Sequence, residues 1–147
     1  MSTADSPNTY RLTVPSIPDR ITEVDEFLES ALRQAGLAEE IIADIAISVT
    51  EIVNNAIDHG NAGDSEKMVR LELTIDVDEV KIEVTDEGEG FNPETVADPL
   101  AQENLLREVG RGIFIVRHLM DTVDIDSVPG RGTMVQITKK LNPSTIS

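Results

Sequence analysis

The sequence predicts an α/β fold, a two-layer sandwich in which helices cover one face of a mixed, mostly antiparallel sheet. Apolar residues recur at helical spacing over residues 20–35 and 38–59, and later segments alternate between apolar and polar residues. The elements follow in the order β-α-α-β-β-α-β-β, so helices are grouped beside the sheet rather than alternating with single strands. With 147 residues, of which 39% are hydrophobic, the chain is long enough for one domain with a substantial core.

The first part of the chain is predicted to hold a strand and two helices. Residues 1–9 are rich in polar residues and are expected to form a flexible tail. Residues 10–14 alternate apolar and polar side chains and are expected to form a strand. The helix over residues 20–35 ends at a glycine, and the helix over residues 38–59 ends at the glycine-rich segment 60–63.

The second part is predicted to contain four strands and a helix. The apolar residues of 69–75 and 80–84 alternate with polar ones, which indicates a hairpin. The remaining predicted segments are a loop over residues 92–109 with a short helix near 100–107, a helix over 113–120, strands over 122–127 and 133–140, and a tail over 142–147. A single domain is therefore expected over residues 10–141.

Composition excludes several classes of function. The net charge of −16 repels a phosphate backbone, which argues against direct nucleic-acid binding, whereas a basic or mixed-charge protein partner remains compatible. No apolar run approaches the roughly 20 residues that a membrane helix needs, and the start does not have the pattern of a signal peptide. The chain has no cysteine, which excludes disulfides, thiolate metal sites and cysteine nucleophiles and fits a cytoplasmic location.

The second predicted helix carries a polar stripe. Glu51, Asn55 and His59 follow one another at intervals of four residues, so their side chains lie along one line of the helix together with Asp44 and Ser48. The opposite face is an apolar stripe that consists of Ile42, Ile45, Ala46, Val49, Ile52, Val53 and Ala56. The polar stripe is either a functional surface or simply the side of the helix that faces solvent.

A carboxylate is expected to point toward the core after the second strand of the hairpin. Asp86 has the same parity as the apolar residues of 80–84, so its side chain should continue their face. A buried carboxylate needs a donor, and the exocyclic amine of adenine is one. Gly88 and Gly90 let the chain turn sharply and leave room for a flat ring. The alternative is a tight turn with a surface aspartate.

Two further glycine segments extend the pattern. Gly110 and Gly112 precede a predicted helix, where exposed backbone N–H groups and the helix dipole favour an anion such as a phosphate. Thr133 follows Gly132 and shares a face with apolar residues of the last strand. Each feature alone is also typical of an ordinary connector or strand start. Their joint occurrence, in this order along the chain, is specific.

These residues resemble the GHKL (Bergerat-fold) ATPase superfamily, and within it the anti-sigma-factor serine protein kinases. The resemblance covers nearly the whole chain, from about residue 10 to residue 141. Residues 51–60 (EIVNNAIDHG) are similar to the N box of that superfamily, and residues 86–91 (DEGEGF) to its first glycine box. Residues 110–121 (GRGIFIVRHLMD) are similar to the second glycine box with its helix, and residues 130–133 (GRGT) to the final box.

The resemblance implies a nucleotide site. It implies that ATP and Mg²⁺ are bound by Asn55, Asp86, Gly88, Gly90, Gly110, Arg111, Gly112, Ile113 and Thr133. Asn55 would coordinate the magnesium that bridges the phosphates, and Asp86 would accept a hydrogen bond from the adenine amine. Residues 92–109 would form a lid over the nucleotide. Glu51 would be the general base that takes a proton from a protein serine.

The resemblance also implies the partners. The chain would be a homodimer that sequesters a sigma factor and phosphorylates a serine on a STAS-type anti-anti-sigma protein. One alternative is a nucleotide-binding regulatory module that sequesters a protein partner without significant kinase activity. A plain α/β domain with no ligand is a further alternative, but it requires all four motifs to be accidental.

Overall fold

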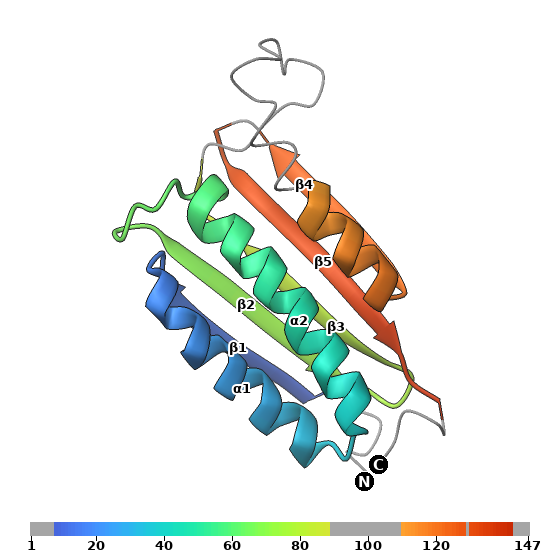
Figure 1. Ribbon diagram of the computed structural model, residues 1–147. Coiled ribbons are helices and arrows are strands. Elements are labelled where there is room, and N and C mark those ends of the chain that lie inside the picture. The colour runs from blue at the N-terminus through green and yellow to red at the C-terminus, as the bar shows by residue number, and fades with distance from the viewer. Residues whose placement is uncertain (1–7, 89–109, 129, 143–147) are drawn as a thin grey trace, which may run out of the picture.

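The computed structural model describes residues 8–88, 110–128 and 130–142 and has two layers (Figure 1). A five-stranded sheet forms one layer, and the helices all lie against the same face of it. The predicted two-layer sandwich is therefore confirmed. The predicted loop over residues 92–109, including its short helix, lies outside the described residues. None of the described helices is long and apolar enough to cross a membrane.

The strand order is β1-β2-β3-β5-β4, and every neighbouring pair is antiparallel. The strands are β1 (Asn8–Pro15), β2 (Met68–Ile75), β3 (Glu79–Thr85), β4 (Thr122–Val128) and β5 (Gly132–Lys140). We expected a mixed sheet, but its described pairs are all antiparallel. The reason is the position of β5: β3 and β4 run in the same direction, and β5 lies between them as an antiparallel partner of both.

Three of the described helices begin or end at other residues than predicted; two of these differences concern the first two helices. The described helical segments are η1 (Pro18–Arg20), α1 (Ile21–Gln34), α2 (Glu39–Asn55), η2 (Ala56–Gly60) and a helix over residues 110–119. A short 3₁₀ turn precedes α1, whose end is followed by Gly36 with a left-handed φ of +81°. The expected single helix over residues 38–59 instead changes to a π-turn after Asn55. Sequence periodicity does not reveal such a turn.

The last helix already includes Gly110, whereas the sequence predicted a start at Ile113. Glycine is disfavoured in a helix by only about 0.5–1 kcal/mol relative to alanine, which packing can override. A glycine marks a helix end when its φ is positive, and the described glycines with positive φ do not include Gly110 or Gly112.

The core lies between the two layers. It is formed by alternate residues of β2 and β3 and by the inward faces of α1 and α2, and it includes Leu28, Leu32, Ile45, Leu73 and Ile82. One expected polar-stripe residue belongs to this interior: the exposed fraction of Ser48 is 0%. Its hydroxyl donates to the backbone oxygen of Asp44 at 2.8 Å, which satisfies the group within the helix and permits its burial.

Candidate functional site

A buried carboxylate lies where the loop after β3 meets the start of β5. The exposed fraction of Asp86 is 5%, so its predicted orientation toward the core side is confirmed. Its Oδ1 accepts hydrogen bonds from the backbone N–H groups of Gly88 and Thr133, both at 3.0 Å. The Asp86 N–H donates to the Thr133 oxygen at 3.0 Å. These bonds fix the aspartate backbone and one carboxylate oxygen to β5.

The second oxygen of Asp86 faces the end of η2. A Cβ added at Gly60 would lie 2.0 Å from Asp86 Oδ2, so only a residue without a side chain fits there. A Cβ added at Gly88 would lie 1.8 Å from the Gly60 oxygen, and one at Gly132 would lie 2.6 Å from the Asp86 backbone oxygen. Within the described part of the chain, both hydrogen bonds to the carboxylate go to Oδ1. The glycines thus allow three backbone segments to close around this side chain.

Two of these glycines were not among the predicted site residues. Gly60 was named as a helix end and as the last residue of the N-box resemblance, and Gly132 as part of the final glycine box. Neither was assigned a contact, because close approach between distant segments leaves no local pattern. Gly88 was expected to leave room for a flat ring, but the space where its side chain would be is taken by Gly60. The expected contribution of Gly90 lies outside the described residues.

Asn61 is a further residue that sequence reasoning missed. It follows η2 directly, is 1% exposed, and accepts a hydrogen bond from the backbone N–H of Glu87 at 2.8 Å. Glu87 is the neighbour of Asp86, so this bond joins the end of η2 to the loop that carries the carboxylate. The only signal in the sequence is a short polar residue after a glycine that ends a helix, which is a common and unspecific pattern.

Thr133 contributes to the site mainly through its backbone. Its N–H and oxygen both bond to Asp86, whereas its hydroxyl forms a hydrogen bond of 2.8 Å with Ser127 on β4. The side chain is half-buried, as expected for a position on the edge of the core face.

A second group of predicted residues meets between α2 and the helix over residues 110–119. A Cβ added at Gly112 would lie 3.1 Å from Glu51 Oε2 and 3.2 Å from Asn55 Nδ2. Glu51 and Asn55 are half-buried and one helical turn apart on α2. The structure therefore brings the acid–Asn helix and the second glycine segment into close contact, although Gly112 follows Asn55 by 57 positions in the sequence.

The other predicted residues of this segment differ in their surroundings. Arg111 is exposed, and the space where a side chain at Gly110 would lie is open. Ile113 is half-buried and packs against the core, which indicates a structural contribution from its side chain. The two groups around Asp86 and Asn55 are connected by η2 itself, because this π-turn begins directly after Asn55 and ends at Gly60. Single π-turns of this kind occur frequently at functional sites.

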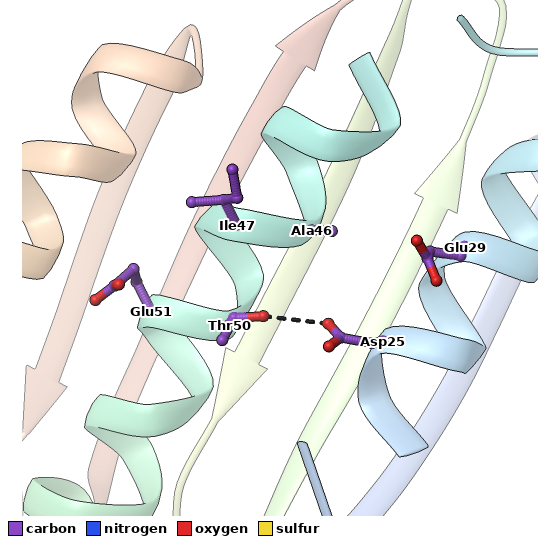
Figure 2. Close-up of a pocket in the computed structure, with 6 residues that line it drawn as sticks. All are labelled: Asp25, Glu29, Ala46, Ile47, Thr50 and Glu51. Carbon is purple, nitrogen blue, oxygen red and sulfur yellow. Dashed lines mark hydrogen bonds between the residues drawn. The ribbon is translucent and has the colours of Figure 1, made fainter. Parts of the chain in front are cut away.

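A shallow groove of about 360 Å³ runs over the outer side of α2 and is distinct from the Asp86 region. It is lined by Asp25, Glu29, Ala46, Ile47, Thr50 and Glu51 (Figure 2). The Thr50 hydroxyl donates to Asp25 Oδ1 at 3.2 Å and so connects α2 to α1. Figure 2 shows Glu51 and Ile47 on the side of α2 turned away from α1. Ala46, expected in the core stripe, is half-buried at this groove.

The described residues contain no group of three or more His, Asp or Glu side chains arranged to hold a metal ion. This arrangement does not conflict with magnesium, which proteins usually bind through one or two side chains together with nucleotide phosphates. Among the predicted residues, Asn55 offers an amide oxygen that fits such a ligand set.

The sandwich, with glycine segments gathered around a buried carboxylate and an acid–Asn helix, defines a kinase-type ATPase domain. A family model described as histidine kinase-like ATPase domain matches residues 14–139. The chain therefore belongs to the histidine kinase-like ATPase domain family.

Curated proteins similar to this chain include several named anti-sigma F factor. The chain is 37% identical over 103 residues to an anti-sigma F factor of Clostridium beijerinckii, covering 69% of this chain and 72% of that protein. It is 40% identical over 108 residues to an anti-sigma F factor of Pasteuria penetrans, covering 71% and 72%. An anti-sigma F factor of Oceanobacillus iheyensis is 29% identical over 139 residues, or 93% of this chain and 95% of that protein.

Two solved structures have the same fold. The crystal structure of the RsbU and RsbW domains of Rv1364c from Mycobacterium tuberculosis superposes with a TM-score of 0.68 and 22% identity. That match covers 91% of this chain and about a third (32%) of the larger one. The mycobacterial sensor histidine kinase MprB matches with a TM-score of 0.52 and 18% identity over 89% of this chain and 97% of the other.

Proposed function

We propose that this chain is an anti-sigma factor with ATP-dependent serine protein kinase activity. It would hold a sigma factor inactive and phosphorylate a serine on a STAS-type anti-anti-sigma protein. Membership of the histidine kinase-like ATPase family supports the ATP-dependent kinase activity. The names of the relatives support the anti-sigma role. The observation that carries it is the buried carboxylate of Asp86, which has one oxygen fixed by the backbone and the other turned toward η2.

Asp86 supplies the recognition of adenine in this proposal. Oδ1 already accepts from Gly88 and Thr133, so Oδ2 is the oxygen that would accept from the exocyclic amine. An ionised carboxylate only accepts hydrogen bonds, and the equivalent position of guanine carries a carbonyl oxygen that also only accepts. The pocket should therefore select ATP over GTP, and the cost of a buried acceptor left without a donor should make this selection strong.

Asn55 and the helix over residues 110–119 supply the phosphate end of the site. The Asn55 amide oxygen would coordinate the magnesium ion, which when bound neutralises charge on the phosphates. Gly112 lies against Asn55, so backbone N–H groups of residues 110–112 are near the same position. Exposed Arg111 adds a cation there, which matters in a chain whose net charge is −16.

Glu51 is the proposed general base. It precedes Asn55 by one helical turn, and its carboxylate lies close to Gly112, which supports a role beside the proposed phosphates. As a carboxylate it can accept the proton of a serine hydroxyl while that oxygen forms its bond to the transferred phosphoryl group and ADP leaves. Because Glu51 also lines the open groove on α2, a protein substrate can reach it from solvent.

The proposal further assigns the chain a homodimeric state, a cytoplasmic location and a single kinase domain over residues 10–141. Residues 92–109 are proposed as the lid over the nucleotide. These assignments rest on the resemblance to the family.

Loss of the base should separate binding from chemistry. The test measures transfer of radiolabelled γ-phosphate to a purified STAS-type protein from the same organism, together with ATP affinity, for the wild type and Glu51→Gln. We expect a loss of about 100-fold or more in the transfer rate, because a positioned base contributes 10²–10⁴-fold, with ATP affinity changed less than threefold. Glu40→Gln is the matched control, since Glu40 is exposed in the first turn of the same helix.

Either of two results counts against the proposal. Transfer at the normal rate by Glu51→Gln shows that another group is the base. Tight ATP binding without any transfer by the wild type shows a nucleotide-dependent sequestering module rather than a kinase.

A further inference from the structure

We infer that Asn61 is a positioning residue for Asp86 and thereby sets the preference of the site for adenine; this rests on the proposed role of Asp86. Asn61 follows η2 with φ −90° and ψ 0°, and its exposed fraction is 1%. It is not part of any motif that the sequence suggested, and it would not touch the nucleotide itself.

Every polar group of the Asn61 side chain is used. Its Nδ2 donates to Ser16 Oγ at 2.7 Å and to the Met68 backbone oxygen at 3.0 Å. Its Oδ1 accepts from the backbone N–H of Glu87 at 2.8 Å. Ser16 in turn donates to the Lys67 oxygen at 2.8 Å. The amide is therefore held by residues next to β1 and at the start of β2. Through its bond to Glu87 it restrains the loop after β3.

The network controls two sides of the Asp86 carboxylate at once. The backbone of Asn61 is bonded to Gly60, whose Cα lies against Oδ2, while the side chain of Asn61 binds the residue directly after Asp86. Asp86 is tied to Thr133 on its other side. The carboxylate thus sits between β5 and the Asn61 network, and each of these contacts limits a different movement.

The Glu87 side chain makes contacts of its own that could also hold the loop in place without Asn61. Its carboxylate accepts from the Met68 N–H and pairs with Arg70 at 3.3 Å. Arg70 and Glu87 are exposed, and exposed ion pairs contribute little. The bond to Asn61 is less accessible to water, and its removal leaves the Glu87 N–H without its acceptor. We therefore expect Asn61 to decide the position of the loop.

The test compares two nucleotides rather than one. Purine riboside triphosphate differs from ATP only in the hydrogen that replaces the 6-amine, so the ratio of the two affinities measures the amine contact alone. A variant that merely destabilises the fold lowers both affinities by the same factor and leaves the ratio unchanged. A variant that displaces Asp86 lowers the ratio. Both dissociation constants are measured by calorimetry with magnesium present, at a temperature where each variant is folded.

We expect the wild type to prefer ATP by about tenfold or more, as for a hydrogen bond to a charged group. In Asn61→Ala the ratio should fall at least fivefold, toward that of Asp86→Asn. Ser16→Ala is the matched control, because it removes a partner of Asn61 but keeps the bond to Glu87, and its ratio should stay within twofold of the wild type.

A second pair of variants covers the case in which Asn61→Ala does not fold. Asn61→Asp keeps an acceptor for the Glu87 N–H and should retain the ratio, whereas the shorter side chain of Asn61→Ser cannot reach all three partners and should lower it. An unchanged ratio in Asn61→Ala or Asn61→Ser overturns the inference while leaving the proposed adenine site intact. Absence of any preference in the wild type overturns the role of Asp86 and the inference with it.

Discussion

Replacing Gly60 by alanine tests the packing of the site more sharply than removal of a functional group. The added Cβ would lie 2.0 Å from Asp86 Oδ2 and 2.5 Å from its Cγ. Nonbonded carbon and oxygen atoms need more than 3 Å, so the carboxylate must retreat by roughly 1 Å or the end of η2 must shift. The carboxylate is held at 3.0 Å by two backbone N–H groups, so it cannot retreat without weakening those bonds.

The size of the effect follows from these bonds. A hydrogen bond to a charged group contributes about 1.5–3 kcal/mol, and overpacking a tight contact costs about 1–3 kcal/mol. Alanine gains about 0.5–1 kcal/mol over glycine in helical backbone, which offsets only part of the loss. We therefore expect Gly60→Ala to lower the free energy of unfolding by about 1–3 kcal/mol and to weaken ATP binding about tenfold or more.

Urea unfolding followed by circular dichroism gives the stability, and calorimetric titration with ATP and magnesium gives the affinity. The reasoning is refuted if Gly60→Ala is as stable as the wild type and binds ATP equally well. Loss of stability with full ATP affinity in the folded fraction would show that the clash is relieved by movement of η2 and not of Asp86.

Three other substitutions have distinct expected outcomes. Gly110→Ala meets open space in a helix and should raise the free energy of unfolding by about 0.5–1 kcal/mol in urea; a loss would contradict the helical assignment at that position. In Gly112→Ala the added Cβ presses against the side-chain ends of Glu51 and Asn55. The rate of phosphoryl transfer should therefore fall at least tenfold, while the free energy of unfolding changes by less than about 1 kcal/mol. A transfer rate equal to that of the wild type would argue against a functional contact there. Ala62 has a φ of +53°, so Ala62→Gly should stabilise the protein by about 1 kcal/mol in thermal unfolding, and a lowered melting temperature would show that the turn tolerates alanine without strain.

The sequence predicted those parts of the fold that local periodicity determines. The alternation of residues 80–84 located β3 and gave the inward orientation of Asp86, because both depend on residues within one strand. The helical spacing located α1 and α2 with ends correct to within a few residues. The strand order was beyond reach, because the insertion of β5 between β3 and β4 depends on pairing between distant segments.

The same distinction applies to the candidate site. Glu51 and Asn55 were noted for their spacing on one helix and given roles by the resemblance, but their contact with Gly112 depends on how two helices pack. Gly60 and Asn61 were missed because their importance comes from contact with Asp86 and Glu87, which follow more than 20 residues later. Local patterns and the resemblance therefore pointed to the side chains that we propose for the chemistry, and they did not predict which residues hold those side chains in place.

The central claim is that Asp86 recognises the adenine of a magnesium-bound ATP. The most direct test is a calorimetric titration of the wild type and Asp86→Asn with ATP, each with and without magnesium. The account predicts magnesium-dependent binding by the wild type and a loss of about tenfold or more in Asp86→Asn, because the amide cannot reproduce an acceptor at both oxygens. Equal affinity in the two proteins, or no binding by folded wild type, would contradict it.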